Sequence, residues 1–292
     1  MNLTLIYGSK RSKKTTFCLE KIEELKNSDN SLKFIILVPE QYSYSREKLI
    51  CDRFGGTGLN GIEVMTFSKL AITLITTKQK NHITPCGKQM LIQNIIKKAK
   101  DEKNPFFSSM SKPGFSKSML EVITELKRHM ITPNHLLEIT KNIKEGNLSD
   151  KLFAISTVYK QYSEEIDENF YDNENDLKKL SDAIYENGEI FKNTYIFIDE
   201  FSDFLPCHYN VIEALLRKCL HMYVTIPCQK NDVTDFSNIV QDTKNRIKSI
   251  ANKNEINIFE IECPKNPDAF SYTIPVLTSG GTSLERSKTP LL

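Results

Sequence analysis

The sequence predicts an α/β protein whose parallel sheet is interrupted by an inserted helical subdomain. Short apolar runs alternate with helical periodicity at the beginning of the chain, and the same alternation returns after residue 193. Between them, residues 84–192 carry helical patterns and almost no strand candidate. Alternating strands and helices are typical of βαβ units with a parallel sheet. We therefore assign 1–83 and 193–263 to one sheet domain, 84–192 to the insertion and 264–292 to a tail.

The first part of the sheet domain is predicted from its apolar runs. Residues 3–7 and 33–38 are largely apolar, as expected of parallel strands that are covered on both faces. The expected elements are strand 3–7, helix 16–25, strand 33–38, helix 46–54, strand 62–67 and helix 68–75.

The insertion and the second part follow the same rules. Thr132-Pro133 combines the cap and the first-turn proline that begin a helix. The tail from residue 264 is rich in Pro, Ser, Thr and Gly without periodicity, so we expect it to be disordered or aberrant. The expected elements are helices 87–100, 118–130, 149–169 and 175–186, strand 195–200, helix 209–220, strand 221–226, helix 237–252 and strand 256–261.

Composition limits the classes of function. The 292 residues are 39% hydrophobic and 26% charged with a net charge of +2, so any nucleic-acid surface must be local. No apolar run approaches the roughly 20 residues of a membrane span, and the N-terminus lacks a signal-peptide layout. We expect a cytoplasmic protein with no membrane partner. Seven scattered cysteines without a C-x-x-C pair indicate reduced thiols rather than metal ligands or disulfides.

Residues 8–16 follow the phosphate-binding pattern G-x-x-x-x-G-K-[ST] with one departure. Gly8 fills the first glycine, Lys14 the lysine and Thr15 the hydroxyl that would hold magnesium. The second glycine is replaced by Lys13, whose Cβ and long side chain would crowd the approach of the backbone to the phosphates. The loop alone leaves two interpretations open, a nucleotide site with one altered part or a basic helix start. The other residues around the anion would be Ser9, Ser12, Lys13 and Thr16, and the positive charge of Lys13 could offset its crowding electrostatically without restoring room.

A pair of carboxylates follows the apolar run 195–198. Asp199 and Glu200 would lie at the carboxyl edge of the parallel sheet, where ligands bind. Asp199 would hold magnesium, through water, opposite Thr15, and Glu200 would orient the attacking water in phosphoryl transfer. A helix-capping acid is the common alternative for such a pair. Combined with the loop, the pair favours a site for ATP and magnesium in which Lys14 and Glu200 are the catalytic candidates.

Several segments resemble known DNA helicases. Residues 199–203, Asp-Glu-Phe-Ser-Asp, resemble the D-E-F-Q-D motif of superfamily 1 helicases of the UvrD type, and residues 64–70 resemble their T-F-H-S-L-type DNA-contacting segment. Residues 37–41, Leu-Val-Pro-Glu-Gln, resemble the L-V-P-E-Q motif of the AddB family, which forms one half of the AddAB helicase–nuclease and is called RexB in some bacteria. Residues 123–133 and 195–209 also resemble that family.

The resemblance implies a RecA-like P-loop domain with a 1B-like helical insertion. It further implies a heterodimer with an AddA-type helicase–nuclease subunit, which unwinds and resects DNA ends in double-strand break repair and recombination. By this resemblance, phosphate and magnesium roles would fall to the loop and to Asp199 and Glu200, and Gln41 would lie near the nucleotide-side edge. Thr66 and Phe67 become candidate contacts to single-stranded DNA. An exposed phenylalanine offers a stacking face to a base, whereas a core aromatic that starts a helix is the alternative for Phe67.

The chain also departs from the AddB pattern. The G-D-x-x-Q-S helicase motif is missing after residues 221–226, and the second RecA-like domain, the nuclease and the four iron–sulfur cysteines are not identifiable. We therefore expect a truncated chain without an iron–sulfur cluster, inactive in isolation. Two other interpretations stay open: a stand-alone P-loop NTPase with a helical lid, and an interaction module whose nucleotide site has decayed.

Overall fold

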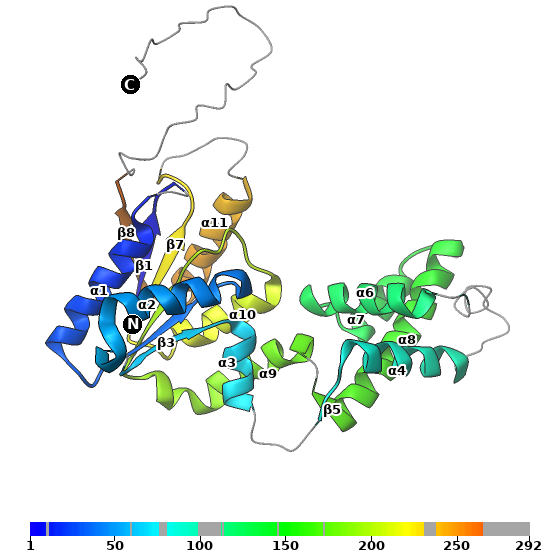
Figure 1. Cartoon of the computed structure of the whole chain (residues 1–292). Coiled ribbons are helices and arrows are strands. Elements are labelled where there is room, and N and C mark those ends of the chain that lie inside the picture. The colour runs from blue at the N-terminus through cyan, green and yellow to red at the C-terminus, as the bar shows by residue number, and fades with distance from the viewer. Residues whose placement is uncertain are drawn as a thin grey trace, which may run out of the picture.

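The computed structural model describes residues 1–9, 12–58, 60–75, 81–98, 112, 114–144, 146–171, 173–230 and 238–264. From residue 265 on, the predicted tail lies outside the described residues. Figure 1 shows a sheet domain and a separate helical block, with the N-terminus at the sheet domain.

The sheet domain contains six strands, all parallel, in the order β3–β2–β6–β7–β1–β8. This arrangement confirms the predicted α/β class and the parallel sheet. Because β1 lies beside β7, and β7 beside β6, the carboxyl ends of these three strands meet at one edge. The strands are β1 (Asn2–Tyr7), β2 (Lys33–Leu37), β3 (Ile62–Met65), β6 (Thr194–Ile198), β7 (His221–Ile226) and β8 (Asn257–Glu262).

Each face of the sheet has its own apolar core. Leu3, Leu5 and Tyr7 of β1 pack in a cluster with α3 (Phe67–Ile75), α9 (Asn173–Asn187), α10 (Pro206–Leu216) and α11 (Asn238–Lys253). Ile6 packs on the opposite face with α1 (Lys14–Ser28) and α2 (Ser43–Gly58). Coverage of both faces explains why the strands read as apolar runs instead of alternating patterns.

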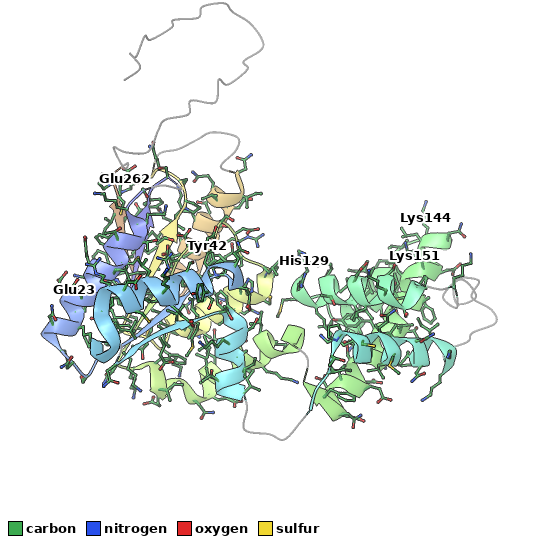
Figure 2. The ribbon with its side chains drawn as sticks, viewed as in Figure 1. Glu23, Tyr42, His129, Lys144, Lys151 and Glu262 are labelled. Atoms are coloured by element: carbon green, nitrogen blue, oxygen red, sulfur yellow. The ribbon has the colours of Figure 1, made fainter. Side chains whose placement is uncertain are left out.

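The helical block has a third core of its own. Ile92, Ile123 and Val158 are fully buried at its centre. In Figure 2, His129 lies at the end of the block nearer the sheet domain, whereas Lys144 and Lys151 lie at the far end. The helices of this core are α4 (Pro85–Lys98), α6 (Phe115–Arg128), α7 (Pro133–Lys141) and α8 (Asn147–Asn169).

The chain enters and leaves the helical block at one place. There, β4 (Asn81–His82) pairs in parallel with β5 (Phe170–Tyr171). After β5, Leu180, Ile184 and Phe191 pack in the core of the sheet domain, although the sequence pattern assigns residues up to 192 to the insertion. The reason is that Leu180 and Ile184, four residues apart on α9, form a stripe that α3 and α10 cover.

Several predicted boundaries shift by a few residues. The helix expected at 209–220 begins at Pro206, a proline at the first helical position, and ends at Leu216. The strand expected at 195–200 ends at Ile198, so both carboxylates lie just beyond it. Among the described helices, none combines the length and the apolar character that crossing a membrane requires.

Candidate phosphate-binding site

The loop between β1 and α1 is tied to the carboxyl edge of the sheet. The backbone N–H of Gly8 donates to the carbonyl oxygens of Ile226, the last residue of β7, at 3.2 Å and of Cys228, just past it, at 2.8 Å. A Cβ added to Gly8 would lie 2.2 Å from Ser12 Oγ and 2.8 Å from Ser12 Cβ, inside van der Waals contact. Glycine is needed at this position because the loop folds back against its own first residue.

Lys14 lies inside this loop rather than on the surface. Its side chain is buried, and its Nζ donates to the carbonyl oxygens of Gly8 at 2.8 Å and Ser9 at 2.7 Å and to Ser12 Oγ at 3.2 Å. Burial lowers the pKa of Lys14, while the negative charges of Asp199 and Glu200 oppose that shift. The ammonium group thus sits at the centre of the loop, at the first turn of α1, where a helix favours an anion.

Lys13, at the position of the missing glycine, has an ordinary backbone conformation. Its φ of −76° and ψ of 29° lie outside the left-handed region that favours glycine, and the residue is exposed. The backbone therefore tolerates lysine, whereas crowding of a bound phosphate by its Cβ stays a prediction. Two other predicted contacts, Thr16 on α1 and Gln41 in the 3₁₀ turn Glu40–Tyr42 after β2, are also exposed.

The predicted carboxylates lie next to the loop. Thr15 Oγ1 donates to Asp199 Oδ2 at 2.9 Å and stands 3.5 Å from Glu200 Oε1. Asp199 is 2% exposed, and its Oδ1 accepts hydrogen bonds from Thr225 Oγ1 at 2.7 Å and from the backbone N–H of Glu200 at 3.0 Å. Glu200 has a φ of 67°, a left-handed conformation that is costly for a residue with a Cβ. The structure thus brings Lys14, Thr15, Asp199 and Glu200 together.

An arginine that the sequence analysis did not single out completes this group. One terminal nitrogen of Arg46, on α2, lies 3.0 Å from Asp199 Oδ2 and 3.1 Å from Glu200 Oε1. Arg46 is 6% exposed. One signal for its burial was available in the sequence. Arg46 lies four residues before the apolar Ile50, so the two side chains share one face of the helix, and Ile50 is buried. Thr225, at the end of β7, was missed because nothing in its local sequence marks it as polar support for Asp199.

This arrangement does not fit a magnesium ion. A threonine hydroxyl and carboxylate oxygens are the ligand chemistry that magnesium prefers, and Thr15 and Asp199 supply it. However, Asp199 Oδ2 already contacts the Arg46 guanidinium, so an ion on that oxygen would meet a buried positive charge. The contacts of Arg46 therefore oppose the magnesium roles predicted for Thr15 and Asp199, which stay predictions.

The two predicted DNA contacts lie inside the sheet domain. Thr66 is 6% exposed, and its Oγ1 accepts the backbone N–H of Lys69 at 3.1 Å in the first turn of α3. Phe67 is 4% exposed, and its ring stacks on His208 with centroids 4.6 Å apart. A ring in this position presents no open face to a base, so the DNA-contact role stays a prediction that requires α3 to move.

The cysteines and histidines do not gather in the described part of the chain. All seven cysteines are free thiols, five of them buried. Within the described ranges, no group of three His, Cys, Asp or Glu side chains has the arrangement of a metal site.

Comparison with known proteins identifies relatives. Residues 5–273 match the family described as "ADDB, N-terminal". Three similar proteins are each named as the B-type subunit of an ATP-dependent helicase/deoxyribonuclease. The protein of Clostridium novyi (strain NT) is 32% identical over 247 residues, 84% of this chain and 22% of the relative. Those of Clostridium acetobutylicum and Clostridium botulinum (strain Loch Maree / Type A3) are 30% and 32% identical, each over 88% of this chain and 23% of the relative. The chain thus spans less than a quarter of their length.

Proposed function

Because the chain belongs to the ADDB N-terminal family, we propose that it forms the RecA-like domain of an AddB-type helicase–nuclease subunit. In this proposal it serves DNA double-strand break repair, by end resection and recombination, in the cytoplasm. It binds DNA and an AddA-type partner subunit, and its phosphate loop accepts ATP. The names of the relatives support the assignment to a helicase/deoxyribonuclease subunit.

One contact carries the nucleotide part of the proposal. The 2.9 Å hydrogen bond from Thr15 to Asp199 joins the first turn of α1, which follows β1, to the residue just after β6, across the intervening β7. Two residues 184 positions apart in sequence meet at the one edge where the phosphate loop, the first turn of α1 and the carboxylates converge. A parallel α/β sheet binds ligands at this edge.

Three features of the chain's own residues support the proposed phosphate binding. Gly8 keeps the loop compact, the N-terminal backbone N–H groups of α1 point toward the anion, and Lys14 supplies a positive charge. A bound phosphate oxygen would take the place of one of the acceptors that Lys14 Nζ now contacts. Ser12 and Thr15 would add hydroxyl groups at the rim of the anion.

We expect the isolated chain to hydrolyse ATP negligibly, even with DNA. Glu200, the predicted residue for positioning water, is ion-paired with Arg46 at 3.1 Å, and its Oε1 lies 3.5 Å from Thr15 Oγ1. Active sites of this class also lie between two RecA-like domains, and the second domain supplies an arginine to the transferring phosphoryl group. The described residues form one such sheet domain.

The test is a DNA-stimulated ATPase assay on the purified chain and on Lys14→Ala. The expected result is the same background turnover for both proteins. Robust turnover that Lys14→Ala abolishes would refute this account and would favour a stand-alone P-loop NTPase.

A second candidate, an interaction module with a decayed nucleotide site, is favoured by the contacts of Lys14. All three of its donor directions end on acceptors from the same loop. ATP affinities of the chain, Lys14→Ala and Lys13→Gly separate the two candidates. Equal, negligible binding by all three would support the interaction module. Binding that Lys14→Ala removes supports a nucleotide site, and a gain with Lys13→Gly would identify Lys13 as the obstacle.

The DNA and partner proposals need separate measurements. Fluorescence anisotropy with labelled single-stranded DNA is expected to show binding that weakens steeply with salt, because phosphate contacts release counterions. Co-purification with an AddA-type subunit tests the heterodimer. A chain that neither binds DNA nor co-purifies would contradict both proposals without affecting the nucleotide site.

A further inference from the structure

We propose that Arg46 replaces the divalent cation at this site, so that the chain takes the phosphates of a nucleotide without a metal ion. The guanidinium of Arg46 is buried and contacts both carboxylates at 3.0 and 3.1 Å. One of these oxygens, Asp199 Oδ2, is the atom that also accepts the hydroxyl of Thr15. The arginine therefore contacts the carboxylate oxygen next to Thr15 at which magnesium is expected.

The charges balance without an ion. Two carboxylates, Asp199 and Glu200, face two cations, Lys14 within the loop and Arg46 on α2. Because an arginine side chain stays protonated at every relevant pH, its positive charge is permanent. A magnesium ion would add two positive charges beside a buried guanidinium and would need near-octahedral oxygen ligands at about 2.1 Å. The ion and the arginine thus compete for one carboxylate oxygen.

Arg46 also keeps a donor for a further acceptor. Its Nε is buried and has no hydrogen-bond partner among the described residues. A planar guanidinium with its donors in a fixed fork suits the paired oxygens of a phosphate group. In this proposal the guanidinium holds both carboxylates and donates to an incoming phosphate oxygen, so that it supplies the positive charge that a metal ion would otherwise supply.

The first experiment uses Mn²⁺ alone, a probe for oxygen-ligand magnesium sites, followed by electron paramagnetic resonance. The wild-type chain is expected to leave Mn²⁺ free, whereas Arg46→Met is expected to bind about one equivalent through Thr15 and Asp199. The matched control is Arg53→Met on the same helix, where Arg53 pairs with Glu23 of α1 at 2.7 Å; it should behave as wild type. Binding by the wild type that Asp199→Asn removes would overturn the proposal. Failure of both wild type and Arg46→Met to bind would also overturn it.

The second experiment rests on the proposed nucleotide binding and compares a fluorescent ATP analogue with magnesium and with EDTA. The wild-type affinity is expected to change by less than about threefold, and that of Arg46→Met to rise at least about tenfold with magnesium. A wild-type affinity that depends on magnesium as strongly as the variant's would contradict the proposal, even where Arg46→Met fails to fold. Absence of analogue binding in every protein would refute the nucleotide proposal, whereas the Mn²⁺ result stands by itself.

Discussion

Replacing Gly8 with alanine tests the compact loop most simply. The added Cβ would lie 2.2 Å from Ser12 Oγ, 2.8 Å from Ser12 Cβ and 3.2 Å from Lys14 Cγ. Rotation of the serine side chain would move its hydroxyl but not its Cβ, so the backbone of the loop has to shift. Overpacking of this kind destabilises a protein by about 1–3 kcal/mol. Alanine also lowers the conformational entropy of the unfolded chain, which offsets about 0.4–1 kcal/mol of that loss. We expect Gly8→Ala to lower the free energy of unfolding by about 1–2 kcal/mol and to weaken binding of an ATP analogue.

Urea unfolding followed by circular dichroism measures this loss. Gly87→Ala in α4 is the control: its Cβ would lie 3.1 Å from Ile83 Cγ1, and alanine in a helix gains up to about 1 kcal/mol over glycine. That variant should be neutral or slightly more stable. The double variant Gly8→Ala/Ser12→Gly removes both clashing atoms and should recover most of the loss. A Gly8→Ala chain as stable as wild type, or no recovery in the double variant, would refute the reasoning.

The remaining predictions concern one buried ring and three partly buried titratable groups. Phe67→Ala is expected to cost about 3–5 kcal/mol in urea unfolding because the ring is 4% exposed, whereas an unchanged stability would mean that the ring is free for DNA. Burial lowers the pKa of His208 and of His221 to about 4, so the folded chain binds fewer protons than the unfolded one between pH 6.5 and 4. The free energy of unfolding should therefore fall on acidification through that window. The fall should reach up to about 3 kcal/mol for His208 and less for the more solvated His221. His208→Phe should make the free energy of unfolding depend less on pH in this window. Although burial opposes the shift, hydrogen bonds from Lys248, Tyr7 and Lys230 lower the pKa of Glu260 to about 2. The stabilisation by ionised Glu260 is present above pH 4.5 and lost toward pH 2. Glu260→Gln should therefore have a lower free energy of unfolding than wild type at neutral pH, and the difference should shrink in acid. A difference that stays constant with pH would contradict this.

Much of the sheet domain could be predicted from the sequence because its signals are local. The apolar runs at residues 3–7 and 33–38 reflect strands that are buried on both faces, and the spacing of Gly8, Lys14 and Thr15 marks the loop. The sequence of α9 alone does not show which of the two domains this helix packs in. Its Leu180 and Ile184 give a stripe that suits either domain, and tertiary packing on α3 and α10 decides which.

In the candidate site, too, some residues could be predicted from local sequence and others depend on tertiary packing. Asp199 and Thr15 could be paired from the rule that parallel strands bring their carboxyl ends to one edge. Arg46 could not, because an arginine on a helix is normally solvated and its burial depends on how α2 lies over the sheet. The 4% exposure of Phe67 likewise follows from three aromatic and histidine neighbours, Phe201, Phe204 and His208, that come from a distant segment.

The claim that residues 8–16 form a working phosphate loop is tested most directly by an equilibrium titration of the chain with labelled ATP, beside Lys14→Ala. The account predicts saturable binding that unlabelled ATP displaces and that the variant weakens by at least about tenfold, since the charge at the centre of the loop is lost. Identical titration curves for the two proteins would contradict it.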